Sequence, residues 1–210
     1  MPGVLLTLVM GVLGTALTAP AASAHVRAPG TRSLATLLAA DGHHFDHRWT
    51  DYDITDAAVS AVLAAKPGSP VRVLTDGSTP VTAFLPTDRA FRRLAHSVTG
   101  RWYRSEARVF SGLAGALGID TIESVLLYHV VPGATITYRA ASHADGAVLA
   151  TGLARRSVTV DVHRHRHHRW VSLVDLDHDS RNPVVVQRDL NRGNLQVAHG
   201  ISRVLRPVNL

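Results

Sequence analysis

The chain has 210 residues, of which 46% are hydrophobic and 18% are charged. This length and balance exclude a wholly disordered chain and are typical of one globular domain with a sizeable core. There is no Cys, which excludes disulfides and a lipid-modified Cys, and the net charge of +6 favours acidic partners such as anionic wall polymers, acidic polysaccharides or lipid headgroups.

The first 24 residues have the pattern of a secretory signal peptide. Residues 4–17 are mostly apolar and uncharged, and residues 22–24 form a small-residue cleavage signature. The start carries no Lys or Arg, which departs from the usual pattern, and an uncleaved membrane anchor is the alternative. No second apolar run has spanning length, so we expect an exported protein without a stable transmembrane anchor, with a signal peptide at 1–24 and a linker at 25–31.

Two helices are predicted next. Apolar spacing and a Ser at the start predict the first over residues 33–42. The second is expected to be capped by Asp53 or Thr55 and to stop at the Pro- and Gly-containing residues 67–70. A short strand is expected at residues 71–74, where β-branched residues follow this turn.

A strand followed by three helices is predicted in the middle of the chain. Residues 81–85 form the strand, and Thr87 is expected to cap the helix that carries Phe91 on its apolar face. Loss of the cap should cost about 1 kcal/mol and Phe91→Ala about 3–5 kcal/mol. Further helices are expected to begin at Ser105 and at residues 120–123, which resemble a capping box.

The last third of the chain has β character. Residues 158–163 alternate between Val and polar side chains, the period of a strand with one buried face. Helices first and strands last indicate an α+β fold. The strand candidates are residues 135–138, 147–151, 157–162, 170–176, 184–187 and 195–204.

Three separated segments carry a recognisable signature. They read VTAFLPTDRAF at residues 81–91, LLYHVVPG at 126–133 and HGISRVLRP at 199–207. In content, order and spacing they resemble the conserved boxes of fasciclin-like domains of the exported bacterial type. The resemblance covers roughly residues 32–208 and implies a fasciclin-like α+β fold, a β-rich wedge or sandwich with helices packed against it. Ser202 stands where the family usually has Asp.

The boxes make physical sense as a framework, because they combine strand residues, a helix start and chain turns. A strand that ends in Pro and leads into a helix cap fixes the angle at which the helix enters the core. The framework residues are Thr82, Phe84, Pro86, Thr87, Phe91, Pro132, Gly133, His199, Ile201, Val204 and Pro207.

The resemblance also implies an adhesion contact around Tyr128, His129 and Val130. The alternative is structural: His129 is buried and hydrogen-bonded to backbone near Thr87, and Tyr128 packs with its hydroxyl group satisfied. Both interpretations fit the sequence.

Residues 163–169 have the most unusual local composition, four His alternating with three Arg. In a strand, alternate His rings would share a face about 7 Å apart, which suits Zn²⁺ or Cu²⁺, although the interleaved positive charge opposes an ion. A solvated hairpin loop is the alternative. The candidate metal ligands are His163, His165, His167 and His168, and the candidate contacts to acidic partners are Arg164, Arg166 and Arg169.

Two other segments carry groups typical of metal sites. Asp175, Asp177 and Asp179 resemble the start of a calcium loop, but Ser180 replaces the Gly such loops need, so an exposed acidic turn is expected. Residues 43–47 hold three His and one Asp whose loose spacing is explained equally well by local hydrogen bonds.

The sequence therefore predicts a secreted or extracellular adhesion module without catalysis or cofactor, contacting a cell-surface or matrix protein or an acidic polysaccharide. Nucleic acid is a poor candidate because the Arg residues are dispersed and aromatic residues make up 5%. The alternative to an acidic partner is that the excess of positive charge serves only solubility. An extracytoplasmic metal-binding protein and a hydrolase remain as alternative functions, although nucleophile-elbow, phosphate-loop and zinc-protease motifs are missing.

Overall fold

The computed structural model describes residues 28–166 and 168–208. The predicted signal peptide at 1–24 and the first residues of the predicted linker lie outside the described residues. The helices are α1 Leu34–Leu38, η1 Ala39–Asp41, α2 Asp53–Ala65, η2 Pro70–Thr75, α3 Asp88–Thr99, α4 Glu106–Tyr128 and α5 Tyr138–Ala141. The strands are β1 Val81–Pro86, β2 Val130–Pro132, β3 Val148–Ala150, β4 Ser157–His165, β5 His168–Val174, β6 Val185–Leu190 and β7 Gln196–Ile201.

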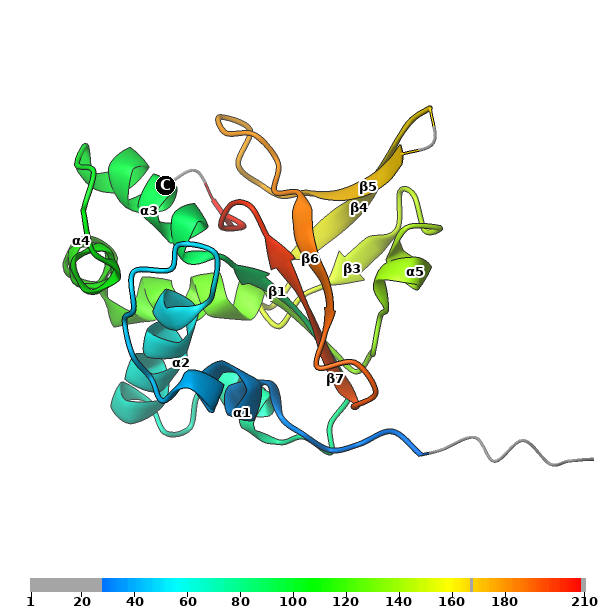
Figure 1. Ribbon diagram of the computed structural model, residues 1–210, viewed down its shortest axis with the longest axis horizontal. Coiled ribbons are helices and arrows are strands. Elements are labelled where there is room, and N and C mark those ends of the chain that lie inside the picture. The colour runs from blue at the N-terminus through cyan, green and yellow to red at the C-terminus, as the bar shows by residue number, and fades with distance from the viewer. Residues whose placement is uncertain (1–27, 167, 209–210) are drawn as a thin grey trace, which may run out of the picture.

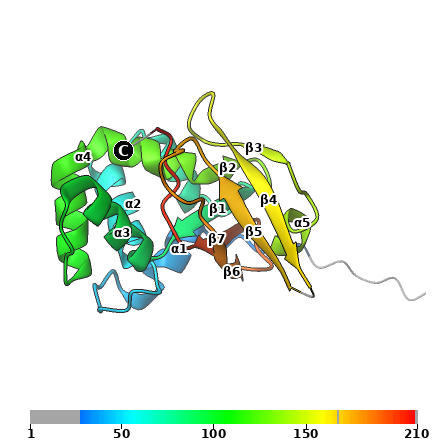
Figure 2. The same ribbon diagram turned by 90° about the horizontal axis from the view of Figure 1, so that it is seen from above.

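The strands form two sheets with the larger helices gathered on one side. One sheet has the order β2-β1-β7-β6 and the other β3-β4-β5. Figures 1 and 2 show α2, α3 and α4 together at one end of the molecule and β3, β4 and β5 at the other. The predicted α+β architecture, a β-rich body with helices packed against it, is confirmed.

The first sheet brings the three signature segments together. Strand β1 lies in its interior, antiparallel to β2, with Thr82 opposite Val131, and parallel to β7, with Phe84 opposite His199. The parallel pairing joins strands that are more than 100 residues apart in the chain, which is possible because the helices and the second sheet fill the crossover. The three segments are far apart in the sequence, but they contribute the adjacent strands β2, β1 and β7 of one sheet.

The core consists of three adjoining apolar clusters. One lies between α1, α2, α4 and β1, a second fills the space between the two sheets, and a third lies between α3 and α4. Phe84, Tyr128 and Leu173 are fully buried in the second cluster. This second cluster fixes the two sheets to each other and so sets the positions of the loops at their edges.

Helix α4 is the longest element. It has 23 residues and contains an 18-residue stretch with a mean hydropathy of 1.4, so by length and composition it could cross a membrane. The expectation that no second apolar run reaches spanning length is wrong by this measure. In this fold the helix is broken at Gly118 (φ 75°, ψ 165°), and Val109 and Val125 from its two halves lie in the same core cluster. The helix predicted to begin at residues 120–123 is therefore the second half of α4. The break that precedes it lies at Gly118, two residues before Asp120.

Two predicted strands are wrong. Residues 71–74 belong to the 3-10 helix η2, because Pro70 fixes its first turn and the Ser69 hydroxyl accepts the backbone N–H of Val71 at 3.2 Å. Residues 135–138 are irregular chain entering α5, where the Thr137 hydroxyl accepts the N–H of Ala140 at 3.2 Å. In both cases a local cap overrides the β preference of the side chains.

The predicted helix caps are only partly confirmed. Ser33 caps α1, accepting the N–H of Thr36 at 3.1 Å. Thr87 occupies the capping position of α3 but makes no side-chain capping bond. Neither Asp53 nor Thr55 caps α2; both lie inside its first turn.

Helix α2 receives its cap from another element. The two carboxylate oxygens of Asp88 accept the N–H groups of Asp53 and Ile54 at 3.2 and 2.9 Å. The side chain of Asp88, from the start of α3, therefore satisfies free donors at the start of α2. This cross-element cap joins the first signature segment, residues 81–91, to the helix that precedes it.

Candidate binding surface

The signature residues at the end of α4 are buried. Tyr128, His129 and Val130 have exposed fractions of 0, 4 and 2%. The Tyr128 hydroxyl donates to the carbonyl of Ser157 at 3.0 Å, and burial followed by the charge of Asp175 raises the pKa of Tyr128 to about 12. Direct contact of these three side chains with a partner stays a prediction, one that would require the core to open.

His129 bonds to the backbone on both sides of its ring. Its Nδ1 lies 2.7 Å from the carbonyl of Val125, and its Nε2 accepts the N–H of Leu205 at 2.9 Å. Burial lowers the pKa of His129 to about 4, so the ring is neutral at pH 7. The expected burial and the expected bonding to backbone are confirmed, and the backbone partners are Val125 and Leu205.

The other polar framework residues are satisfied inside the fold in the same way. His199 lies 2.9 Å by Nε2 from the carbonyl of Ile136, and its Nδ1 accepts the N–H of Asp189 at 3.2 Å. The Thr82 hydroxyl donates to Ala134 at 2.8 Å and accepts from Ile136 at 2.7 Å. Bonded on both sides, these groups hold the loop after β2 against β1 and β7 and have no free atom to offer a ligand.

The remaining framework residues divide between core and surface. Phe84, Pro86, Thr87, Phe91, Ile201, Val204 and Pro207 are buried, whereas Pro132 and Gly133 are exposed at a turn. Gly133 adopts φ 78°, a conformation that favours glycine, and its N–H bonds to the carbonyl of Pro80 at 2.9 Å. The Pro-Gly pair therefore ends β2 and turns the chain, as the sequence predicts.

In the acidic segment after β5, Asp175 and Asp177 are buried and Asp179 is exposed, so the predicted exposed turn is wrong for the first two carboxylates. Asp177 is 2% exposed and lies 3.0 Å from Nη1 of Arg206, while Asp175 accepts the N–H of the same residue at 2.9 Å. Burial opposes ionisation of Asp177, but bonds from Asp179, Ser180 and Arg206 outweigh it and lower the pKa. A basic residue from the chain end, distant in sequence, explains why these carboxylates are inside.

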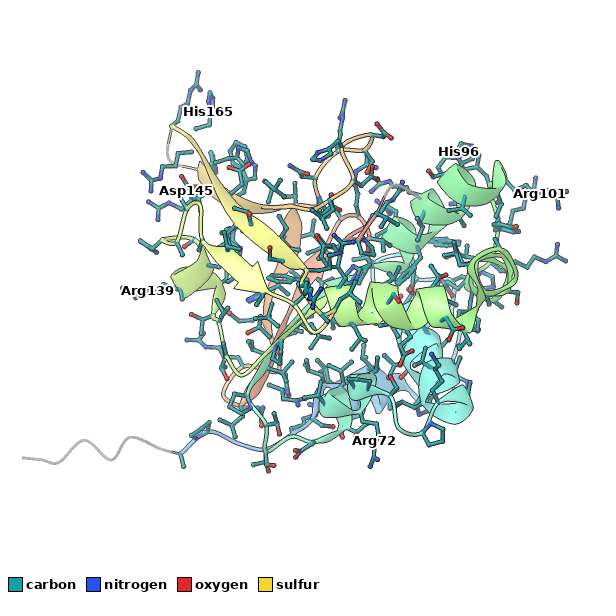
Figure 3. The ribbon with its side chains drawn as sticks, turned by 180° about the vertical axis from the view of Figure 1, so that it is seen from behind. Arg72, His96, Arg101, Arg139, Asp145 and His165 are labelled. Carbon is teal, nitrogen blue, oxygen red and sulfur yellow. The ribbon has the colours of Figure 1, made fainter. Side chains whose placement is uncertain are left out.

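The His- and Arg-rich segment is the end of a β-hairpin. Pairing of β4 with β5 continues to His165 opposite His168, beyond the loop start expected after Val162. Figure 3 shows His165 at the tip of this hairpin, away from the body of the domain. Arg164 and Arg166 are exposed, and Arg169 donates to the carbonyl of Ser142 at 3.0 Å.

The metal-binding alternative for this hairpin stays a prediction. His167 is not among the described residues. Among those that are, the groups of three possible ligands close enough to share an ion do not include His163, His165 or His168. His163 is engaged within the sheet, where it stacks on Trp170 with ring centroids 5.2 Å apart.

His163, Ser172 and Asp161 lie together but are not arranged as a hydrolase triad. The Nε2 atom of His163 is 2.8 Å from the Ser172 hydroxyl and 3.0 Å from the Asp161 carboxylate. A catalytic triad needs the serine and the carboxylate on different ring nitrogens, so that one orients the ring and the other gives up a proton. Here the same nitrogen faces both, and Ser172 is 3% exposed.

A groove on another face gathers basic side chains that the sequence did not single out. The groove lies between the loop before α2, the start of α3, β6 and the chain after β7. It is lined by Trp49, Thr50, Thr87, Arg89, Arg93, Val186, Gln187 and Ser202. Because Arg203 follows Ser202 directly and Arg93 donates to the carbonyl of Ser202 at 2.9 Å, we call this surface, with Arg203 included, the basic groove.

Neighbouring guanidinium groups repel that of Arg203. Burial and the charges of Arg93, Arg181 and Arg206 lower the pKa of Arg203, although it stays charged at pH 7. In the described part of the chain, none of Arg89, Arg93 and Arg203 pairs with a carboxylate. The only sequence signal was the density of Arg at residues 89–93, since the other walls come from distant segments.

The fold and its surfaces define the class of this protein. It is an α+β domain whose polar signature residues hydrogen-bond within the framework and which has a hollow lined by Arg89 and Arg93. The chain belongs to the fasciclin domain family, because the family model described as Fasciclin domain matches residues 56–207. This family is associated with cell adhesion, and its domains are generally not catalytic.

The solved structures include one with the same type of domain. It is described as a FAS1 domain pair from the insect cell adhesion molecule fasciclin I, and it is 13% identical, with a TM-score of 0.45. The match covers 73% of this chain and 43% of that chain, so this chain spans less than half of that structure. A search of curated proteins found no match.

Proposed function

We propose that this protein is an exported adhesion module that binds acidic polysaccharides or anionic wall polymers at the cell surface or in the extracellular matrix. We further propose that the basic groove is the contact surface. The observation that carries the proposal is that Arg89 and Arg93 line one hollow, with the charge of Arg203 next to Arg93, and that none of the three has a carboxylate partner among the described residues.

An acidic polymer suits this arrangement for an electrostatic reason. Like charges held close together destabilise one another, and an anion placed among them removes that repulsion while forming charge-assisted hydrogen bonds. Guanidinium groups bind planar carboxylates and sulfates through paired donors. A chain of anionic groups would gain these contacts at successive positions along the groove.

Export is supported by the sequence at the start of the chain. The apolar residues 4–17 and the small-residue signature at 22–24 match a secretory signal peptide, and a chain without Cys tolerates an oxidising compartment. A basic surface outside the cell would meet anionic polymers at high concentration. The exposed Arg164 and Arg166 on the hairpin offer a second, smaller basic patch for the same partner.

The test compares binding to polymers that differ only in charge. The untagged protein is titrated onto immobilised heparin, polygalacturonate and neutral dextran at 0.05 to 0.3 M salt. We expect binding to the two polyanions and not to dextran, weakening as salt increases because the charges are exposed. The groove variant R89S/R203S should bind heparin about five- to thirtyfold more weakly.

A matched control removes the same charge elsewhere. Arg72 and Arg101 project from the domain at sites apart from the hairpin (Figure 3), and both are exposed. The control R72S/R101S should bind heparin within twofold of the wild type. Equal losses in both variants would show that net charge alone drives binding, and a loss confined to R164S/R166S/R169S would place the contact on the hairpin.

A further inference from the structure

A cluster of carboxylates between the segment before α2 and the start of α4 serves no part of the proposed function. One oxygen from each of Asp46, Asp51 and Glu106 lies within 4.8 Å of the other two. Asp51, Asp53 and Asp88 form a second group that shares Asp51. Negative charges this close are unfavourable unless something neutralises them.

Two oxygens in this cluster lack a hydrogen-bond partner. Among the described residues, Oε1 of Glu106 and Oδ1 of Asp51 are buried side-chain oxygens without one. Glu106 as a whole is 0% exposed, and its other oxygen accepts the N–H of His47 at 2.9 Å. A buried carboxylate oxygen without a partner is strongly unfavourable, so it points to a ligand that completes its coordination.

The chemistry of the three oxygens fits a hard divalent cation. Calcium binds carboxylate oxygens at about 2.3–2.6 Å, so two oxygens on one ion lie at most about 5 Å apart. Soft transition metals prefer imidazole or thiolate, which this cluster does not offer from its three members. Exposed Asp46 gives the ion a path from solvent, and water can fill the remaining positions.

We propose that Asp46, Asp51 and Glu106 form a calcium-binding site that fastens the segment before α2 to the start of α4. This inference goes beyond the proposed function. Asp46 lies in the loop, Asp51 just before α2 and Glu106 at the first position of α4. One ion would therefore reinforce the link that the bond from the N–H of His47 to Glu106 makes between these elements. Nε of the nearby Arg48 lies 3.8 Å from Oδ2 of Asp46, and the backbone N–H of Arg48 donates to Oδ1 at 2.8 Å.

A proton is the competing way to neutralise the cluster. Burial and a hydrogen bond with Asp51 raise the pKa of Asp88 to about 9, so this neighbouring carboxyl group is protonated at neutral pH. That proton relieves the charge around Asp51 but leaves Oε1 of Glu106 without a partner. The experiment must therefore separate metal binding from proton binding.

The test is calorimetric titration of calcium alone into the untagged protein, stripped of metal with a chelator, at pH 7.5. We expect one saturable site with a Kd of about 0.1–1 mM, the range of weak calcium sites. With 10 mM calcium the unfolding temperature should rise by about 3–10 °C. The absence of both the heat and the thermal shift would overturn the proposal and leave proton sharing as the explanation.

Three variants assign the site. D46N changes an exposed residue and should fold normally. D51N and E106Q each remove the negative charge of a carboxylate that has an oxygen without a hydrogen-bond partner. Each should weaken calcium binding at least tenfold and remove most of the thermal shift. The control D120N changes an exposed carboxylate that pairs with Lys66 on the other side of α4's kink and should bind calcium like the wild type. Unchanged affinity in D46N, D51N and E106Q would overturn the assignment even if calcium binds elsewhere.

Discussion

Leu205 donates its backbone N–H to Nε2 of His129 at 2.9 Å, although 76 residues separate the two in the chain. Because Nε2 accepts this bond, the neutral ring carries its proton on Nδ1, which donates to the carbonyl of Val125. The two ring nitrogens therefore tie the end of α4 to the segment that follows β7. Protonation would turn Nε2 into a donor facing a donor and break this connection.

The stability of the domain should depend on pH through His129. Its pKa is 6.5 in the unfolded chain and about 4 in the fold, so the unfolded state binds the extra proton. Stability is therefore full above pH 6.5 and is lost as the pH falls from 6.5 toward 4, by about 3 kcal/mol at most. Burial also lowers the pKa of His199, which adds a loss of the same sign.

Urea unfolding at pH 7.5, 6 and 4.5 measures this loss. The variant H129Q should be less stable at pH 7.5, because the amide fits the two backbone groups less well, but its stability should fall less between pH 6.5 and 4. Parallel curves for wild type and H129Q would contradict the assignment of the loss to His129.

Removing one member of the buried pair between Asp177 and Arg206 should be costly. The variant D177A leaves a guanidinium group that is 11% exposed without this carboxylate, which typically costs about 3 kcal/mol. Chemical denaturation measures the change. The double variant D177L/R206M removes both charges and should recover much of the loss, whereas a double variant as unstable as D177A would mean that the polar contacts of the segment, not charge pairing, stabilise it.

Gly200 should not tolerate a side chain. A Cβ atom placed there would lie 2.0 Å from the Tyr52 hydroxyl and 3.0 Å from Cβ of Gln187. We expect G200A to lower the free energy of unfolding by about 1–3 kcal/mol. The variant Y52F removes the closest atom, so G200A should cost less in a Y52F background; strict additivity of the two changes would show that the clash is relieved in another way.

Tyr128 distinguishes a framework role from a contact role. The variant Y128F leaves the carbonyl of Ser157 without its hydroxyl donor and should cost about 1 kcal/mol of stability. Heparin affinity should stay within twofold of the wild type, measured in the binding assay described above. Weaker binding at unchanged stability would instead support the direct adhesion contact that the sequence suggested.

The sequence predicted the framework well because local patterns of apolar side chains determine it. The strand at 81–85, the helix that follows it and the alternating Val residues of β4 each follow from the spacing of apolar side chains. The three signature segments predicted the fasciclin-like fold. Their pairing around β1 could not be predicted, because a parallel pairing between strands more than 100 residues apart produces no periodic pattern in the sequence.

Two predicted strands failed because a local cap formed instead, whereas in the other errors a distant group overrides a local preference. Asp88 caps α2 from another helix, so the nearby Asp53 is not needed as a cap. Arg206 draws Asp177 into the interior, although an acidic run read alone favours a solvated turn. The basic groove was missed because Arg93 and Arg203 are brought together only by the packing of α3 against the chain after β7.

The most direct test of the proposed function is to map the contact on the protein itself. In nuclear magnetic resonance spectra of the ¹⁵N-labelled protein, a short heparin oligosaccharide is titrated while the backbone N–H and arginine Nε–Hε signals are followed. The proposal predicts that the largest saturable shifts occur at Arg89, Arg93 and Arg203 and in the loop around Thr50. Shifts confined to the hairpin from His163 to Arg169, with the groove signals unchanged, would contradict it.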